Sequence, residues 1–425
     1  MRIKRYARKW AWSFALIGAR AFAVVSVTSI AIANLRKLWR SDVILFYPDG
    51  GFGHTLIGPD WLRRLHPGTR NLIFFGTYPR HHNLLIGALW RPQMFVWVWI
   101  GFRLPGGIDV VDVAWAYRIF AVFDRIVRKF APNKICYFGL DGLVSATSRP
   151  HWLAAGSFFD TRHESRYYTT INTRPAPPIH IPESVRSRVE CQLADRFGTV
   201  YPRQCALYIR HRGAADGEDL SSFTRLSAPF EAYLPAVKVL NDAGYQVLVT
   251  GDTRVPPQTV KDMKGGVIDW RSSGVELEDF QVYAGTEVDI HIGNLSGGSA
   301  YLYITDIPGL MLNAFPFGDS LPKTTVHYKR LRAENGSLVT PDQLFTKFFF
   351  DHDCTGYCLE DASPDELAEV VRDFIEHCHD QRPYGIEPSQ IGLDAPWFRA
   401  ADARLSPVWL ANFESRLPDR LAQGN

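Results

Sequence analysis

Three turns in this sequence contain residue types that bind phosphate, and each follows a run of apolar residues. The first, 49–54, reads Asp-Gly-Gly-Phe-Gly-His and comes after the apolar run 43–47. Glycine has no side chain and adopts φ > 0, so backbone N–H groups in such a turn can approach a ligand closely. A helix over 55–65 would direct its own unpaired N–H groups at an anion. The spacing matches neither a dinucleotide-binding fingerprint nor a P-loop, so this turn alone does not identify a site.

The second and third motifs offer charged and polar groups at similar positions. Arg210 and Arg212 follow the apolar run 205–209, and a Gly/Ser turn at 294–299 follows the run 288–292. Arginine presents planar, permanently charged donors to phosphate oxygens, and a Gly/Ser turn presents backbone N–H groups and hydroxyls. Because ligands bind at the carboxyl ends of the strands in open α/β sheets, the three motifs together favour a diphosphate site. If a sugar diphosphate is cleaved there, these groups would stabilise the charge on the leaving group without a metal ion.

Apolar runs and helical stretches alternate along the chain in two series. Short, continuous apolar strands separated by helices predict α/β domains, each with a parallel sheet covered on both faces. A proline-rich segment, 173–184, separates the two series and is expected to be an extended linker. The predicted domains are therefore 41–172 and 185–380, preceded by an N-terminal segment, 1–40, and followed by an extension, 381–425. Two such domains imply a cleft between them, where ligands commonly bind.

The predicted strands are the apolar runs, and the predicted helices are the stretches with helical periodicity. Strands are expected at 43–47, 71–75, 134–138, 205–210, 246–249, 267–268, 288–292 and 309–312, and 94–100 is either a strand or the start of a buried helix. Helices are expected at 55–65, 114–130, 182–197, 230–243, 276–284 and 364–379, and a further helix is expected to begin near Ala300.

Composition limits the class of protein. The 425 residues suffice for two domains, and 46% hydrophobic with 21% charged residues is typical of a globular protein. The formal net charge of +3 gives no reason to expect nucleic acid as a partner. The six cysteines show no pairing pattern, which favours a reducing compartment over a disulfide framework. Cys354 and Cys358 near His352, and the group at 377–379, lack the spacing of usual zinc sites, so no metal is expected.

The N-terminal segment has the composition of a membrane-associated helix. Basic residues cluster within 2–9 and 36–40, and between Trp10 and Leu35 the only charged residue is Arg20. We favour a monotopic or partly inserted helix, held by its apolar residues and by basic residues on anionic lipid. A true span comes second, because Arg20 would cost about 2.5–3.5 kcal/mol near the bilayer centre. A cleaved signal peptide or a buried core helix would also fit the composition of this segment.

The order of the three motifs resembles the GT-B glycosyltransferases of the fucosyltransferase-like group. The segment 50–56, Gly-Gly-Phe-Gly-His-Thr-Leu, the arginine-containing strand and the Ser-Gly turn follow one another as in that group. A closer resemblance is to a family of predicted bacterial glycosyltransferases associated with polysaccharide biosynthesis. Its basis is Arg210, Arg225, Tyr233-Leu234-Pro235-Ala236, Val249-Thr250-Gly251-Asp252 and Ile268-Asp269-Trp270. The resemblance covers residues 43–380 and is strongest over 205–330.

The resemblance implies a GT-B fold, with two Rossmann-like domains facing a cleft and a nucleotide-sugar donor held mainly by the C-terminal domain. It implies a metal-independent glycosyltransferase of the hexosyl- or deoxyhexosyltransferase type, with no cofactor besides the donor substrate and with a glycan or lipid-linked acceptor. By position, Arg210 would contact the donor pyrophosphate, and Asp49 or His54 would be the general base if the reaction inverts the anomeric centre. The residues expected near the donor or acceptor are Gly51, Gly53, Arg212, Asp252, Asn294, Ser296, Gly297, Gly298 and Ser299.

Two further classes of function stay open. Tyr208 and His54 depart from the fucosyltransferase-like pattern, which would suit an inactive, membrane-associated protein that binds nucleotide sugar or glycan. A nucleotide-sugar-modifying enzyme, such as an epimerase or hydrolase, is the second of these classes. The expected location is the cytoplasmic face of the bacterial inner membrane, whereas Asn294 and Asn335 begin glycosylation sequons that would suit a lumenal domain.

Overall fold

The computed structural model divides the chain into two compact units, Met1–Phe158 and Phe159–Asn425, here called unit 1 and unit 2. The structure describes residues 17–18, 25, 35–47, 54–69, 71–78, 84–90, 94–100, 102–104, 108–110, 113–138, 174, 178–198, 201–210, 228–251, 253–295, 297–315, 321, 323–347, 356–378, 384–393, 398–399 and 402–413.

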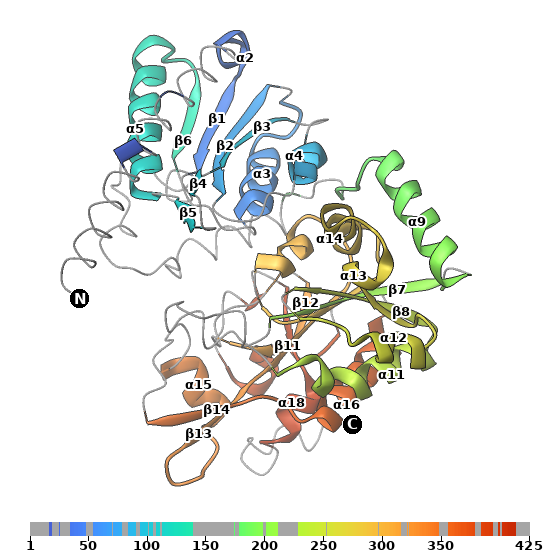
Figure 1. Cartoon of the computed structure of the whole chain (residues 1–425). Helices are drawn as coiled ribbons and strands as arrows, with labels where there is room; N and C mark the ends of the chain where they lie inside the picture. Colours follow the sequence, from blue (N-terminus) through green and yellow to red (C-terminus); the bar gives the residue numbers. More distant parts are fainter. Residues whose placement is uncertain are drawn as a thin grey trace, which may run out of the picture. The chain divides into compact units, whose positions relative to one another are not determined.

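Unit 1 is built on a parallel sheet of four strands in the order β3-β2-β1-β6 (Figure 1). The strands are β1 (Val43–Tyr47), β2 (Leu72–Tyr78), β3 (Met94–Ile100) and β6 (Ile135–Phe138). The strands predicted in this half are confirmed, and 94–100 is a strand rather than the start of a helix. Side chains from Val43 to Phe46 are all buried, which explains the continuous apolar run. The other elements are α2 (Leu35–Arg40), α3 (His54–Leu65), α4 (Leu84–Trp90), β4 (Phe102–Leu104), β5 (Ile108–Val110) and α5 (Val113–Phe130).

Unit 2 contains a parallel sheet of seven strands in the order β15-β12-β11-β10-β7-β8-β9. These strands are β7 (Arg203–Ile209), β8 (Tyr245–Gly251), β9 (Val267–Asp269), β10 (Ile290–Gly293), β11 (Gly309–Ala314), β12 (Thr324–Tyr328) and β15 (Arg404–Leu405). An antiparallel ribbon is formed by β13 (Arg330–Ala333) and β14 (Tyr357–Glu360). The predicted α/β class with a parallel sheet is confirmed, and residues 404–405 of the predicted extension form one of the two edge strands, β15.

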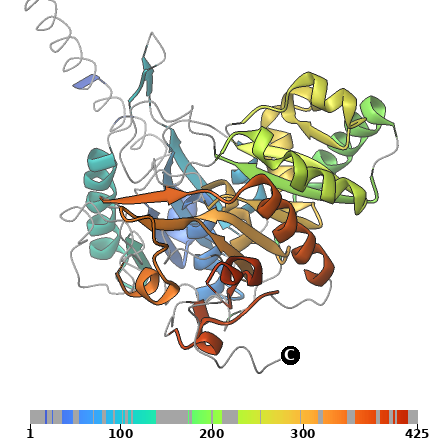
Figure 2. The same ribbon diagram turned by 90° about the horizontal axis from the view of Figure 1, so that it is seen from below.

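Helices cover both faces of this sheet (Figures 1 and 2). On one face, α11 and α16 pack together, and their apolar side chains meet those of β7, β8, β10 and β11 in the main core. On the other face lies α14, whose Tyr283 hydroxyl donates to Gln204 Oε1 of β7 at 2.8 Å. The helices are α9 (Glu183–Phe197), η2 (Phe230–Tyr233), α11 (Leu234–Asp242), α12 (Pro257–Asp262), α13 (Trp270–Ser273), α14 (Leu277–Thr286), η3 (Gly297–Tyr303), α15 (Pro341–Lys347), α16 (Pro364–His377), η5 (Pro388–Ile391) and α18 (Pro407–Ala411).

Two predicted helices differ from the expectation in their geometry. The helix predicted over 230–243 begins as the 3₁₀ helix η2 and continues as α11. Pro235 has no N–H to donate to the Glu231 carbonyl, so regular α-helical bonding does not extend back across it. The helix expected near Ala300 is the 3₁₀ helix η3, and the two glycines at its start disfavour an α-helix.

The predicted membrane-associated helix lies almost entirely outside the described residues. Of residues 1–34, the structure describes only Ile17, Gly18 and Val25. In the part of the chain that is described, no helix is both long enough and apolar enough to span a bilayer.

Candidate functional site

The candidate site lies at the carboxyl ends of β7 and β10, in the middle of the seven-stranded sheet. After β7, the chain adds β8 and β9 on one side, whereas β10, β11 and β12 extend the sheet on the other side. Successive strands therefore depart in opposite directions from this pair. In Rossmann-type sheets of this order, nucleotides bind outside the carboxyl ends of the two strands where the direction changes. Arg210 follows β7 directly, and the turn 294–299 follows β10 directly, so the fold brings two of the three predicted motifs together.

Two glycines allow the strand ends to approach closely. Gly251 ends β8 and Gly293 ends β10, with φ values of 96° and 156°. A Cβ on Gly251 would lie 2.2 Å from the carbonyl oxygen of Ile209, and a Cβ on Gly293 would lie 2.3 Å from that of Tyr208. Only glycine fits at these two positions beside the end of β7. Neither glycine is among the predicted site residues, although each comes shortly after a predicted strand and directly before a polar residue.

Asn294 connects the end of β7 to its neighbours. Its Oδ1 accepts a hydrogen bond from Arg210 N at 3.0 Å, and its backbone N donates to the Tyr208 carbonyl at 2.9 Å. Its Nδ2 donates to the Tyr233 hydroxyl at 3.0 Å and to the Leu312 carbonyl at 3.1 Å. The side chain is fully buried, so water does not compete for these contacts. Asn294 therefore fixes the point where Arg210 leaves β7, and its burial excludes glycosylation of this sequon in the folded chain.

The remaining described residues of the predicted site differ in their accessibility. Arg210 is half-buried, as are Gly297 and Gly298 at the start of η3. Ser299 is 3% exposed, so its side chain belongs to the interior of unit 2. Among these described residues, the groups that a ligand can reach are therefore the Arg210 side chain and the backbone of the two glycines.

Gly298 also accommodates an aromatic side chain of β7. A Cβ on Gly298 would lie 2.1 Å from Cε2 of Tyr208, well inside contact distance. The Tyr208 ring therefore packs against the glycine backbone at the start of η3. This contact gives a structural reason for the tyrosine at position 208.

Asn313 and Tyr233 belong to the same network, although neither is among the predicted site residues. Asn313 has a φ of 49°, at an irregularity in the register of β11 between Leu312 and Ala314. Its Nδ2 lies 3.5 Å from the Tyr233 hydroxyl, and its Oδ1 accepts a hydrogen bond from Ala362 N at 2.7 Å. The single hint in the sequence is an asparagine within an apolar strand, since asparagine tolerates positive φ.

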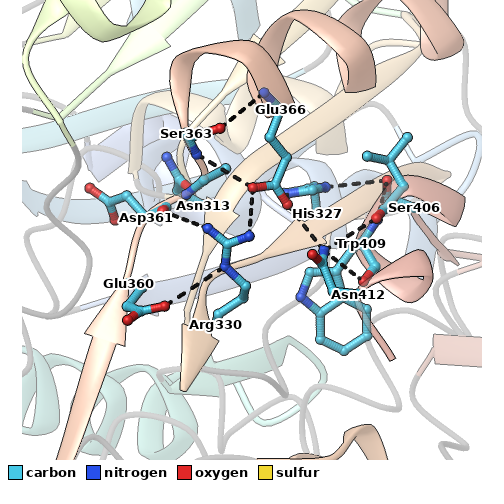
Figure 3. A network of polar contacts seen from close by, with 12 residues as sticks. Asn313, His327, Arg330, Glu360, Asp361, Ser363, Glu366, Ser406, Trp409 and Asn412 are labelled. Carbon is cyan, nitrogen blue, oxygen red and sulfur yellow. Dashed lines mark hydrogen bonds and ion pairs between the residues drawn. The ribbon is translucent and has the colours of Figure 1, made fainter. Parts of the chain in front are cut away.

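Charged side chains meet where β12 ends and α16 begins (Figure 3). Glu366 Oε2 accepts a hydrogen bond from Arg330 Nη1 at 2.8 Å. Glu366 Oε1 accepts one from Asn412 Nδ2 at 3.2 Å and lies 3.4 Å from Nε2 of the buried His327. Burial raises the pKa of Glu366, but the hydrogen bond and charge of His327 and the charge of Arg330 outweigh it and lower the pKa to about 2.

The segment before α16 is held by three further contacts. Lys329, which is 1% exposed, places its Nζ 2.7 Å from Asp361 Oδ1. Ala362 N is bound to Asn313, and Ser363 caps α16 by accepting a hydrogen bond from the backbone N of the third residue of the helix. These contacts make the region a support for the ends of β11 and β12.

In unit 1 the strand order β3-β2-β1-β6 puts the corresponding change of direction between β1 and β6. The predicted turn 49–54 leaves the carboxyl end of β1 and leads into α3, whose first residue is His54. The position of the His54 side chain lies outside the description. Predicted site residues that lie outside the described residues are Asp49, Gly51, Gly53, Arg212, Asp252 and Ser296.

No cluster of three or more His, Cys, Asp or Glu side chains suited to a metal ion occurs within the described ranges. Cys191, Cys205, Cys358 and Cys378 are free thiols there. Cys354 and His352, which were considered as zinc ligands together with Cys358, lie outside the described residues.

Comparisons with known proteins give structural similarities only. No protein-family model matches the chain, and no curated protein matches it. The solved structure of Escherichia coli ADP-heptose lipopolysaccharide heptosyltransferase II matches with a TM-score of 0.38 and 12% identity, over 79% of this chain and 99% of that chain. The E. coli heptosyltransferase WaaC, solved with ADP, matches with a TM-score of 0.36 and 13% identity, over 80% and 98%. A family 9 glycosyltransferase from Veillonella parvula matches with a TM-score of 0.35 and 11% identity, over 64% and 79%. Scores of this size do not establish a shared fold, so the assignment of a function depends on the contacts within this chain.

Proposed function

We propose that this protein is a glycosyltransferase that moves a sugar from a nucleotide-sugar donor to a glycan or lipid-linked acceptor in surface polysaccharide biosynthesis. The observation that carries the proposal is the hydrogen bond from Arg210 N to Asn294 Oδ1. It joins two predicted phosphate-binding motifs at the point where a Rossmann-order sheet binds nucleotides. The sequence resemblance to bacterial GT-B glycosyltransferases agrees with this assignment.

In this proposal, unit 2 binds the donor through its diphosphate. The Arg210 guanidinium is permanently charged and has several donors, which suits phosphate oxygens. The backbone N–H groups at Gly297 and Gly298 would supply further donors without a side chain in the way. Arg212, which follows β7 in the sequence, would contact the phosphate, and Asp252, which follows β8, would contact the ribose hydroxyls. Asn294 would act as a positioning residue rather than as a donor ligand, because its amide is bound within the protein.

In the proposed transfer, residues of unit 2 would bind the diphosphate and residues of unit 1 would act on the acceptor. The acceptor hydroxyl would attack the anomeric carbon while the bond to the diphosphate oxygen breaks. Negative charge would then grow on the nucleoside diphosphate, where the fixed Arg210 charge stabilises it. If the reaction inverts the anomeric centre, Asp49 or His54 would take the proton of the acceptor hydroxyl, and Gly51 and Gly53 would let the substrates approach the backbone of unit 1.

The proposed reaction is metal-independent, with hexosyl or deoxyhexosyl transfer from the donor. The proposed location is the cytoplasmic face of a bacterial inner membrane, with residues 1–40 on the membrane surface. The sequence supports the metal-independent reaction because arginine and glycine N–H donors can bind the diphosphate. It supports the membrane location because the apolar N-terminal segment has basic residues on both sides.

A pair of arginine variants tests the donor site. Arg210 and Arg203 lie at opposite ends of β7, so Arg203→Ala is a matched control for Arg210→Ala. A panel of nucleotide sugars would first be screened by thermal shift, because a bound ligand stabilises the fold. Arg210→Ala is expected to weaken the best ligand at least about tenfold, since hydrogen bonds to charged groups contribute about 1.5–3 kcal/mol. Arg203→Ala is expected to bind as the unmodified chain does.

The outcomes separate the three classes of function. Transfer of sugar to an added glycan or lipid-linked acceptor, lost in Arg210→Ala, supports the proposal. Tight binding without transfer to any acceptor would assign an inactive binding protein instead. Turnover of the donor in the absence of acceptor would assign an epimerase or hydrolase. Equal donor affinity in Arg210→Ala and Arg203→Ala would show that Arg210 does not bind the donor.

A further inference from the structure

The helix α5 carries an exposed apolar stripe. Val122, Ile126 and Phe130 recur every four residues, so they lie on one face of the helix. Their side chains are 52%, 46% and 66% exposed. The outward face of a helix in a soluble domain is normally polar, and adjoining exposed apolar side chains of this size mark an interaction surface.

Basic side chains border this stripe. Arg125 and Lys129 are exposed on the same helix, and each lies beside the stripe because it follows a member of it, Val122 or Ile126, by three residues. Asp124 is the only acidic residue of α5, and it accepts a hydrogen bond from Arg128 Nε at 2.9 Å. Lys129 Nζ lies 5.5 Å from the centroid of the Phe130 ring. The stripe therefore lies within a field of net positive charge.

The apolar surface continues onto α2 at the C-terminal end of α5. Lys134, in the turn after α5, donates from Nζ to the Trp39 carbonyl at 2.7 Å, which holds this turn against α2. Trp39 is 70% exposed and Ile135, the first residue of β6, is 45% exposed. Figure 1 shows α2 and this end of α5 at the same end of unit 1. We define the α2–α5 face as the apolar residues Trp39, Val122, Ile126, Phe130 and Ile135 with the basic residues Arg36, Arg40, Arg125 and Lys129.

The sequence before α2 points to what covers this face. The predicted membrane-associated segment, with a single charge between Trp10 and Leu35, leads directly into α2. A bilayer that holds this segment would therefore meet unit 1 at α2. Apolar side chains among basic ones fit the boundary between acyl chains and anionic headgroups, where Lys and Arg side chains reach the phosphates.

A second copy of the chain fits the face less well. A two-fold symmetric contact places the same surface of both copies together. The basic residues of the two copies would then face each other, and like charges across an interface are unfavourable. Anionic lipid, in contrast, complements both the apolar stripe and the charge.

We propose that the α2–α5 face docks on the surface of a lipid bilayer that contains anionic headgroups. Ile126 and Phe130 enter the interfacial region, and Arg125 and Lys129 contact lipid phosphates. This docking is a property of unit 1 alone and stands apart from donor binding by unit 2. It extends the membrane contact predicted for residues 1–40 onto α5 and the start of β6, which lie outside that segment.

Charge-matched variants of the full chain test the docking. Ile126→Glu combined with Phe130→Glu lowers the net charge by two, and so does Lys238→Glu on the exposed surface of α11 in unit 2. Binding is measured by flotation with vesicles of phosphatidylcholine alone and of phosphatidylcholine mixed with phosphatidylglycerol. On the anionic vesicles, the double variant is expected to partition at least about tenfold more weakly, since burying such side chains is worth more than the 1.4 kcal/mol per tenfold. Lys238→Glu is expected to bind as the unmodified chain does.

A photoreactive amino acid at position 126 identifies the occupant directly. With anionic vesicles present, it is expected to crosslink to lipid, whereas the same residue at position 238 does not. Crosslinking to a second copy would overturn the proposal in favour of a dimer interface. Crosslinking to residues 1–34 of the same chain would overturn it in favour of an internal contact. Equal flotation of the double variant and Lys238→Glu would also overturn it, and because nucleotide-sugar binding is measured separately, that result leaves the proposed enzyme function intact.

Discussion

Replacing Asn294 by alanine tests whether the buried amide holds the candidate site together. Three side-chain hydrogen bonds are lost: from Arg210 N at 3.0 Å, to the Tyr233 hydroxyl at 3.0 Å and to the Leu312 carbonyl at 3.1 Å. At about 1 kcal/mol net for each, the change lowers the free energy of unfolding of unit 2 by about 3 kcal/mol. Since Asn294 is fully buried, solvent does not replace these contacts.

The effect on the site goes beyond the loss of stability. Without its acceptor, Arg210 N no longer fixes the direction in which the chain leaves β7. Donor binding then has to order the backbone at Arg210, and the free energy needed for this reduces the net binding free energy. Donor affinity is therefore expected to fall at least about tenfold, equivalent to about 1.4 kcal/mol.

Asn241→Ala is the matched control for this change. Asn241 Nδ2 donates to the carbonyls of Tyr245 and Gly266, both at 2.8 Å, at the amino ends of β8 and β9. Its loss is expected to cost about 2 kcal/mol of stability while leaving the carboxyl ends of the strands unchanged. Asn294→Ala and Asn241→Ala thus differ in donor affinity much more than in stability.

Two measurements compare the variants. Hydrogen exchange of the backbone amides of β7 and β10 reports the stability of unit 2 without interference from unit 1. Isothermal titration calorimetry gives the affinity for the nucleotide sugar that produces the largest thermal shift. Equal binding of this ligand by the two variants would refute the positioning role of Asn294, and so would an Asn294→Ala chain as stable as the unmodified one.

Two further predictions concern the packing and the charges around the site. Gly298→Ala is expected to lower the unfolding free energy by about 1–3 kcal/mol, because the added Cβ would lie 2.1 Å from the Tyr208 ring, and urea denaturation checks it. The pKa of Glu366 is about 2 in the folded chain, against an ordinary value of 4.5. The ionised side chain therefore stabilises the folded chain by about 3 kcal/mol above pH 4.5, and this stabilisation is lost as the pH falls toward 2. Glu366→Gln should therefore flatten the decline of stability between pH 4.5 and 2, and Glu369→Gln, on the exposed side of the same helix, should not. If the two variants decline alike, the contacts of Glu366 with His327 and Arg330 have no such effect.

The strands could be predicted from the sequence because most of them are buried on both faces. The run 205–210 was expected to be a strand and β7 spans Arg203–Ile209, and the run 309–312 lies within β11, Gly309–Ala314. A strand that is buried on both faces has a continuous apolar sequence, which differs from the three-to-four-residue spacing of apolar residues in an amphipathic helix. Local backbone chemistry shifted the ends, as at Pro235, where the missing N–H converts the start of a predicted helix into η2.

The support of the site could not be predicted, because it depends on contacts between distant segments. Tyr233 meets Asn294 across 61 positions of sequence, and Asn313 meets Ala362 across 49. Such pairs are set by the order and register of strands in the sheet, which no single segment encodes. Glu366 could be predicted as the third residue of a capped helix but not as the partner of the buried His327, since nothing local to α16 indicates that neighbour.

The burial pattern sharpens the chemistry expected at the end of β7. Asn294 and Ser299 were expected to touch the donor, yet both are buried, and the hydrogen bonds of the Asn294 amide bind strand ends to each other. Among the described residues of the predicted site in unit 2, the reachable groups are then Arg210 and the glycine backbone at 297–298. A guanidinium and backbone N–H groups recognise phosphate oxygens, which every nucleotide sugar shares, and they do not distinguish one sugar from another. Under the proposed function, Arg210 and this glycine backbone would hold the nucleoside diphosphate, and selection of the sugar would have to come from side chains beyond this group.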